Sequence, residues 1–129
     1  MKNKVLVVLS VTVGLLMASG PMFAHHGGQA YDKGKLKTLK GTVVKFLFIN
    51  PHPLLLLKVK GDKGNVEEWT MQFHPPARLA RGLGWNRNTL KPGDQITVIG
   101  HPEKTGHTLI MPQKIVMPDG REVDPDNVP

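Results

Sequence analysis

Short stretches in which apolar and polar residues alternate, each ended by prolines or glycines, restrict what this chain can fold into. Residues 66–73 carry the clearest alternation, because Trp69, Met71 and Phe73 are separated by polar residues. Residues 54–60 repeat the pattern around their leucines. A period of two is typical of strands with one buried face, and it does not suit an amphipathic helix. The chain is therefore expected to form a small all-β domain with these apolar residues in its core.

The order of the expected elements predicts the fold class. Strands are expected at residues 39–49, 54–60, 66–73, 95–100 and 108–116. A short helix at residues 77–81 is expected between the third and fourth strands, opened by Pro76 and closed by Gly82. Gly41 in the first strand indicates a bend or a close backbone approach. This order predicts an all-β fold, a five-stranded OB-like barrel with one short helix between strands three and four.

The N-terminal residues are typical of a secretory signal peptide. A basic start with Lys2 and Lys4 precedes an apolar run over residues 5–18, and small residues lead to Ala24. The apolar run is shorter than the ~20 residues of a membrane span, which disfavours an uncleaved anchor. We therefore expect cleavage after Ala24, no membrane span after cleavage, and a periplasmic or secreted protein that starts at His25.

Length allows one domain, since the chain has 129 residues. Its expected organisation is a signal peptide at 1–24, an N-terminal arm at 25–38, an OB-like barrel at 39–118 and an acidic C-terminal tail at 119–129. The tail follows a turn at Asp119 and Gly120 and is expected to be loose.

Composition argues against several functions. The absence of Cys excludes disulfides, thiolate metal sites and a catalytic thiol. The sequence has no Gly-x-Ser-x-Gly motif, and Glu67 and Glu68 are adjacent and so point to opposite faces of a strand. The net charge of +7 is compatible with a nucleic-acid partner. However, export and the scarcity of aromatic residues for base stacking argue against that partner. We expect neither an enzyme nor a nucleic-acid binder.

Four of the six histidines are candidate metal ligands. His25 and His26 stand at the expected mature terminus, where a free α-amine and an imidazole can chelate an ion together. His52 and His74 each follow the end of an expected strand. Nitrogen donors suit Cu(II) or Ni(II), and copper heads the affinity series. The sequence therefore predicts a copper cofactor on these four residues, held or delivered rather than used in a reaction.

Plainer interpretations of these residues stay open. His52 can instead bond a backbone carbonyl and organise its loop, while His101 and His107 are expected to be solvated. Met111 and Met117 are expected to be core residues, like Met71.

The alternative function is a metal-free module that binds a ligand or another envelope protein. Its docking surface would be the barrel face or the short helix, which carries Arg78 and Arg81.

Three motifs resemble a family of small exported bacterial proteins of unknown function. They are Ala24-His25-His26, Asn50-Pro51-His52 and Leu90-Lys91-Pro92-Gly93-Asp94, in this order. The resemblance implies export and an OB-like barrel, and it implies no reaction. In the family, aromatic residues often follow Asn-Pro-His, whereas this chain has Leu54 and Leu56.

Overall fold

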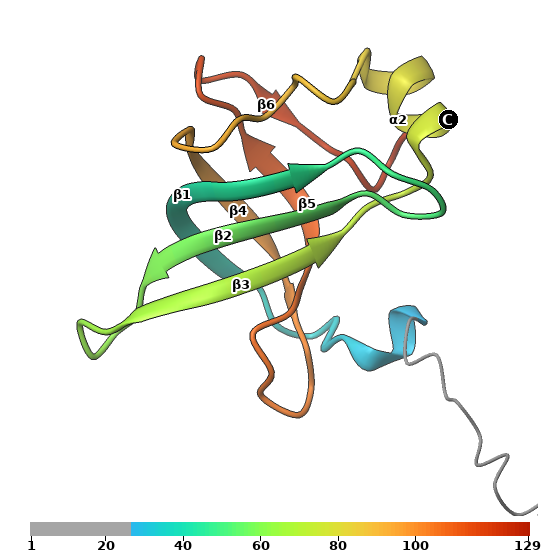
Figure 1. Ribbon diagram of the computed structural model, residues 1–129. Helices are drawn as coiled ribbons and strands as arrows, with labels where there is room; N and C mark the ends of the chain where they lie inside the picture. The colour runs from blue at the N-terminus through green and yellow to red at the C-terminus, as the bar shows by residue number, and fades with distance from the viewer. Residues whose placement is uncertain (1–26) are drawn as a thin grey trace, which may run out of the picture.

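A curved antiparallel sheet with a short helix at one end makes up most of the molecule (Figure 1). The computed structural model describes residues 27–129. The strand order is β3-β2-β1-β4-β5-β6. The elements are the 3-10 helix η1 (Gly28–Ala30), β1 (Lys37–Leu47), β2 (Leu54–Lys60), β3 (Val66–Gln72), α2 (Pro76–Leu83), β4 (Gln95–Pro102), β5 (Ile110–Val116) and β6 (Glu122–Val123).

The five expected strands are all present, and the prediction of a mostly β fold with one short helix is confirmed. The sheet nevertheless has six strands and is not closed into a barrel. Within residues 27–129, β3 reaches the segment before β5 through a single bridge between Thr70 and Leu109. The added strand β6 pairs with Ile115 and Val116 on the edge of β5 that faces away from β4. That edge is the one a closing strand would need.

Strand β1 is shared by both halves of the sheet, and the two halves overlap at Gly41. Its first half pairs with β4 and its second half with β2, and Gly41 is in register with both Val59 and Ile96. A Cβ atom at Gly41 would collide with the backbone carbonyl of Lys58. The predicted close backbone approach at this glycine is therefore confirmed.

The core contains the expected alternating residues. Trp69, Met71 and Phe73 are all buried, as are Leu55 and its alternate neighbours on β2. Met117 is also buried, whereas Met111 is only half-buried and lines a cavity. The core prediction is thus confirmed for all of these residues except Met111. Its residues are Leu39, Val43, Leu55, Leu57, Val59, Trp69, Met71, Phe73, Leu79, Trp85, Leu90, Ile96, Val98, Ile110, Ile115, Met117 and Val128.

Helix α2 runs past its predicted end. It continues to Leu83, and Gly84 ends it in the left-handed region at φ 69°. The expectation that Gly82 closes the helix is therefore wrong, because Gly84 supplies the positive φ that a helix C-cap needs. In the described part of the chain, no helix has the length and apolar character to cross a membrane.

The C-terminal segment is packed against α2, so the expectation of a loose tail is wrong. The Arg78 guanidinium donates to the Val128 carbonyl at 2.6 Å, and the Val128 side chain is 3% exposed. The chain end accordingly lies beside α2 (Figure 1). Asp124 accepts the N–H groups of Asp126 and Asn127 at 3.0 Å, which folds the segment locally.

This packing gives Gly82 an unusual expected response to alanine. In a helix, Gly→Ala ordinarily stabilises by about 0.5–1 kcal/mol. Here the new Cβ would lie 2.8 Å from Val128 Cβ, so Gly82→Ala is expected to destabilise by about 1 kcal/mol. In a Val128→Gly background the same change is expected to cost less or to stabilise. Urea unfolding of the four proteins measures the coupling, and additive effects would contradict the proposed contact.

Candidate metal site

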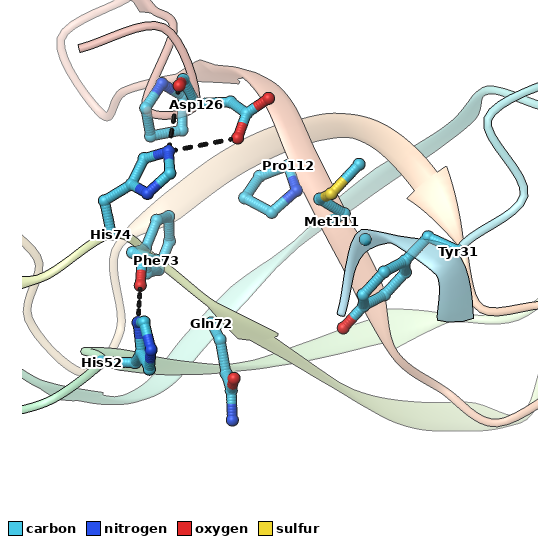
Figure 2. Close-up of a pocket in the computed structure, with 10 residues that line it drawn as sticks. Tyr31, His52, Gln72, Phe73, His74, Met111, Pro112 and Asp126 are labelled. Carbon is cyan, nitrogen blue, oxygen red and sulfur yellow. Dashed lines mark hydrogen bonds and ion pairs between the residues drawn. The ribbon is translucent and has the colours of Figure 1, made fainter. Parts of the chain in front are cut away.

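One cavity brings together two of the four predicted metal ligands. It has a volume of about 170 Å³ and lies between the β1–β2 loop, the end of β3, the start of β5 and the C-terminal segment (Figure 2). His52 comes from the loop and His74 follows β3. His25 and His26 lie outside the described residues. The lining residues are Gly28, Tyr31, His52, Gln72, Phe73, His74, Met111, Pro112, Pro125 and Asp126.

His52 has one ring nitrogen engaged and one available. Its Nδ1 lies 2.8 Å from the Phe73 carbonyl oxygen (Figure 2). A carbonyl only accepts, so Nδ1 carries the proton and donates it, and the lone pair of the neutral ring is on Nε2. The loop-organising interpretation of His52 is thus confirmed. It is compatible with metal binding, because metal-ligating histidines usually donate their other N–H to a carbonyl or carboxylate.

His74, by contrast, has both ring nitrogens occupied. Nε2 is 3.0 Å from the Asp126 carbonyl oxygen and 3.3 Å from Asp126 Oδ1. Nδ1 is 3.3 Å from an Arg78 guanidinium nitrogen, which can only donate. A metal on His74 would have to break one of these bonds, and at Nδ1 it would also face the Arg78 cation. In this structure, His74 anchors the C-terminal segment to the end of β3.

The two histidines expected to be solvated differ from one another. His101 donates from Nδ1 to the Lys35 carbonyl oxygen at 2.7 Å and is half-buried, so it fastens the N-terminal arm to β4. His101 is thus partly solvated, as expected, and its ring is additionally held by this hydrogen bond, which was not expected. His107 has a 73% exposed side chain, as expected, although its Nδ1 lies 3.3 Å from Glu103 Oε2.

The described residues alone do not form a complete metal centre. Within residues 27–129, no three His, Asp or Glu side chains come together in a way that could hold an ion. Sequence reasoning also missed Tyr31 and Asp126 as cavity residues. The sequence signal that could have found Asp126 is the turn-forming Asp-Pro-Asp at 124–126 followed by the apolar Val128.

The geometry defines a small, mostly β protein with a histidine-lined cavity beside its C-terminal segment. A model of a family of unknown function, DUF6152, matches residues 12–111. The chain belongs to this family. No curated protein resembles the chain closely enough to count as a relative.

Some solved structures are distantly similar to the chain. A crystal structure of the ZRD-deleted mutant of TiaS in complex with agmatine is 18% identical, with a TM-score of 0.47, and the match covers 74% of this chain and 23% of the TiaS chain. A crystal structure of TiaS in complex with a tRNA and ATP is 20% identical with a TM-score of 0.43, over 67% of this chain and 19% of TiaS. The chain thus spans less than a quarter of these TiaS chains. Similarity at this level assigns no activity to it.

Proposed function

We propose that the protein is exported to the periplasm or the cell exterior and holds or delivers copper through its mature N-terminus. His25 supplies the α-amine and an imidazole, His26 an amide nitrogen or a second imidazole, and His52 a remote imidazole. His74, the other remote ligand predicted from the sequence, is replaced in this role by His52, because both of its nitrogens are already bonded.

The position of Gly28 is the observation that carries this proposal. Gly28 lines the same cavity as His52. His25 is three residues before Gly28, and three residues span at most roughly 10 Å. The terminal amine and imidazole are therefore within chain reach of a cavity that already contains an imidazole with a free Nε2 lone pair. Nitrogen donors from both segments would make a site suited to Cu(II).

The proposed fold behind this site is OB-like although its sheet is open. Three features support it: β1 pairs with both β2 and β4, a helix stands between β3 and β4, and Thr70 bridges to Leu109 in a parallel sense. In such an arrangement the β3 and β5 edges face each other. The arm and the β1–β2 loop meet at one cavity, which Gly28 and His52 both line.

Titration with Cu(II) tests the proposal. Three proteins are compared: one starting at His25, one with an extra residue before His25, and His25→Ala. Both changes are expected to weaken binding by at least about tenfold, because each removes a chelating group. Affinity is also expected to fall as the pH is lowered, because the amine and imidazole nitrogens must be deprotonated to bind the metal.

The controls separate a specific site from general histidine binding. The extended protein keeps every side chain, so a loss of copper affinity in this protein identifies the free amine as a ligand. His52→Ala is compared with His107→Ala, because His107 is exposed and does not line the cavity with His52. Only His52→Ala is expected to weaken binding. Equal copper affinity in the three terminal variants would disprove the site.

Metal-free binding is the second candidate function, and a second cavity favours it. The helix surface predicted for docking is less available than expected, because Arg78 is committed to Val128 and His74. A larger cavity of about 600 Å³ lies beside the histidine cavity and shares Tyr31 and Gln72 with it. This favours a small molecule over a protein as the metal-free ligand.

A further inference from the structure

The larger cavity lies beside the bridge between Thr70 of β3 and Leu109, the residue before β5. Its volume of about 600 Å³ lies within the ~300–1,000 Å³ range of small-molecule sites. Its walls come from the N-terminal arm, the outer edge of β3 and the β4–β5 loop. The lining residues are Ala30, Tyr31, Thr70, Gln72, Glu103, Lys104, Thr105, His107 and Leu109.

Backbone hydrogen bonds hold these three walls together. The Lys104 N–H donates to the Ala30 carbonyl at 3.0 Å, and Tyr31 forms a bridge with Glu103. The Thr70 N–H donates to the Thr108 carbonyl at 3.0 Å. The arm, the strand edge and the loop are thus mutually fixed, and the cavity is formed before any ligand arrives. Preformed sites lose less free energy to ordering when they bind.

Polar side chains around the cavity have unused hydrogen-bonding capacity. Within residues 27–129, no hydrogen bond or ion pair engages the Tyr31 hydroxyl, the Thr70 hydroxyl, the Gln72 amide or the Lys104 ammonium. Burial, followed by the negative charge of Glu103, raises the pKa of Tyr31, so its hydroxyl stays protonated and can donate. All four groups can donate to an acceptor on a ligand.

Glu103, the acidic residue of the cavity, is already hydrogen-bonded to residues of its own loop. Its Oε1 accepts from the Thr105 hydroxyl at 2.7 Å, and its Oε2 accepts from the N–H groups of Thr105 and His107 at 2.9 and 3.1 Å. The hydrogen bond from the Thr105 hydroxyl, with those from the His107 and Thr105 N–H groups, holds the pKa of Glu103 below its usual range. The carboxylate therefore shapes the loop and does not serve a ligand.

Lys104 is the cation of this cavity, and its ammonium has no partner among the described residues. It also lines a neighbouring hollow that contains Lys33 and Asp32. Asp32 accepts from the Gly34 N–H at 3.1 Å and lies 3.6 Å from Lys35 Nζ, so this carboxylate, like that of Glu103, is already engaged. Apolar surface comes from Ala30, Leu109 and the Tyr31 ring. Apolar walls with a cation at the mouth are complementary to a molecule that has an apolar body and an anionic head.

We propose that this cavity binds a small amphipathic organic anion, with its apolar body against Ala30 and Leu109 and its carboxylate on the Lys104 ammonium. The Thr70 and Gln72 side chains are placed to donate to polar atoms along the ligand. The site uses none of the proposed copper ligands. Anion binding and copper binding can therefore be tested independently of one another.

Calorimetric titration of the purified protein with octanoate, without metal, tests this inference. Octanoate is expected to bind saturably with one molecule per chain. Octan-1-ol has a similar apolar body and no charge, and it is expected to bind about tenfold more weakly. Absence of saturable octanoate binding, or equal affinity for the alcohol, would overturn the inference.

A matched pair of charge variants locates the site. Lys104→Met is expected to weaken octanoate binding about tenfold. Lys63→Met removes the same charge from the exposed β2–β3 turn and is expected to leave the affinity unchanged. Thermal unfolding verifies that both variants fold. An equal loss of octanoate affinity in the two variants would mean that octanoate is attracted only by the overall positive charge. It would refute a site at Lys104.

Discussion

Gly41→Ala is expected to lower the free energy of unfolding by about 3 kcal/mol, at the upper end of overpacking costs. The added Cβ would meet the Lys58 carbonyl oxygen and would lie 2.8 Å from Leu57 Cγ. Backbone atoms of a central strand cannot move aside without disturbing β1 and both of its neighbours, because Gly41 is in register with β2 and β4. Urea unfolding followed by tryptophan fluorescence measures the loss.

Gly27→Ala is the matched control for this substitution. The nearest atom to a Cβ at Gly27 is 3.9 Å away, an ordinary van der Waals contact. Its expected effect is within about 0.5 kcal/mol, as for most surface changes. If Gly41→Ala were as mild as the control, the close approach of β1 and β2 at this position would be incorrect.

Trp85→Ala is expected to destabilise the protein by about 3–5 kcal/mol, the usual cost of truncating a buried aromatic side chain. Trp85 is 4% exposed and packs edge-on against two phenylalanines. Its ring centroid is 5.9 Å from that of Phe46 and 5.5 Å from that of Phe73. The substitution is therefore expected to open a cavity between β1, the residue after β3 and the segment after α2.

Chemical denaturation of Trp85→Ala also has a built-in reporter, because Trp69 is the other tryptophan of the chain. Leu36→Ala serves as a control, since Leu36 is 66% exposed and is expected to contribute little. Comparable losses from the two substitutions would mean that Trp85 does not join α2 to the sheet. The Phe46–Phe73–Trp85 cluster would then not be a major source of stability.

The candidate site was only partly predictable. The loop-organising bond of His52 was expected as one of two interpretations, because prolines on both sides fix its backbone. The engagement of His74 was not expected, since its partner Asp126 is 52 positions away in the segment taken to be loose. The cavities depend on three or four segments meeting, so no local pattern could indicate them.

Local patterns in the sequence determined the strands and their buried faces. Residues 54–60 form β2 with the predicted bounds, because alternation and flanking turn residues are properties of a short window. The burial of Trp69, Met71 and Phe73 follows from the same period of two. Gly41 likewise indicated a bend or a close approach of another backbone segment, although the sequence did not indicate which strand approaches.

Only the tertiary structure decided where the helix ends and how the edges of the sheet are paired. Gly82 and Gly84 look alike as helix terminators, but in the folded chain Gly84 takes the positive φ of 69° that ends α2, whereas Gly82 stays helical and lies against Val128. The end of β5 pairs with β6, and β3 meets the chain before β5 only through the bridge between Thr70 and Leu109, beside which the larger cavity lies. These outcomes depend on contacts between residues far apart in the sequence, and periodicity carries no information about which distant segments meet.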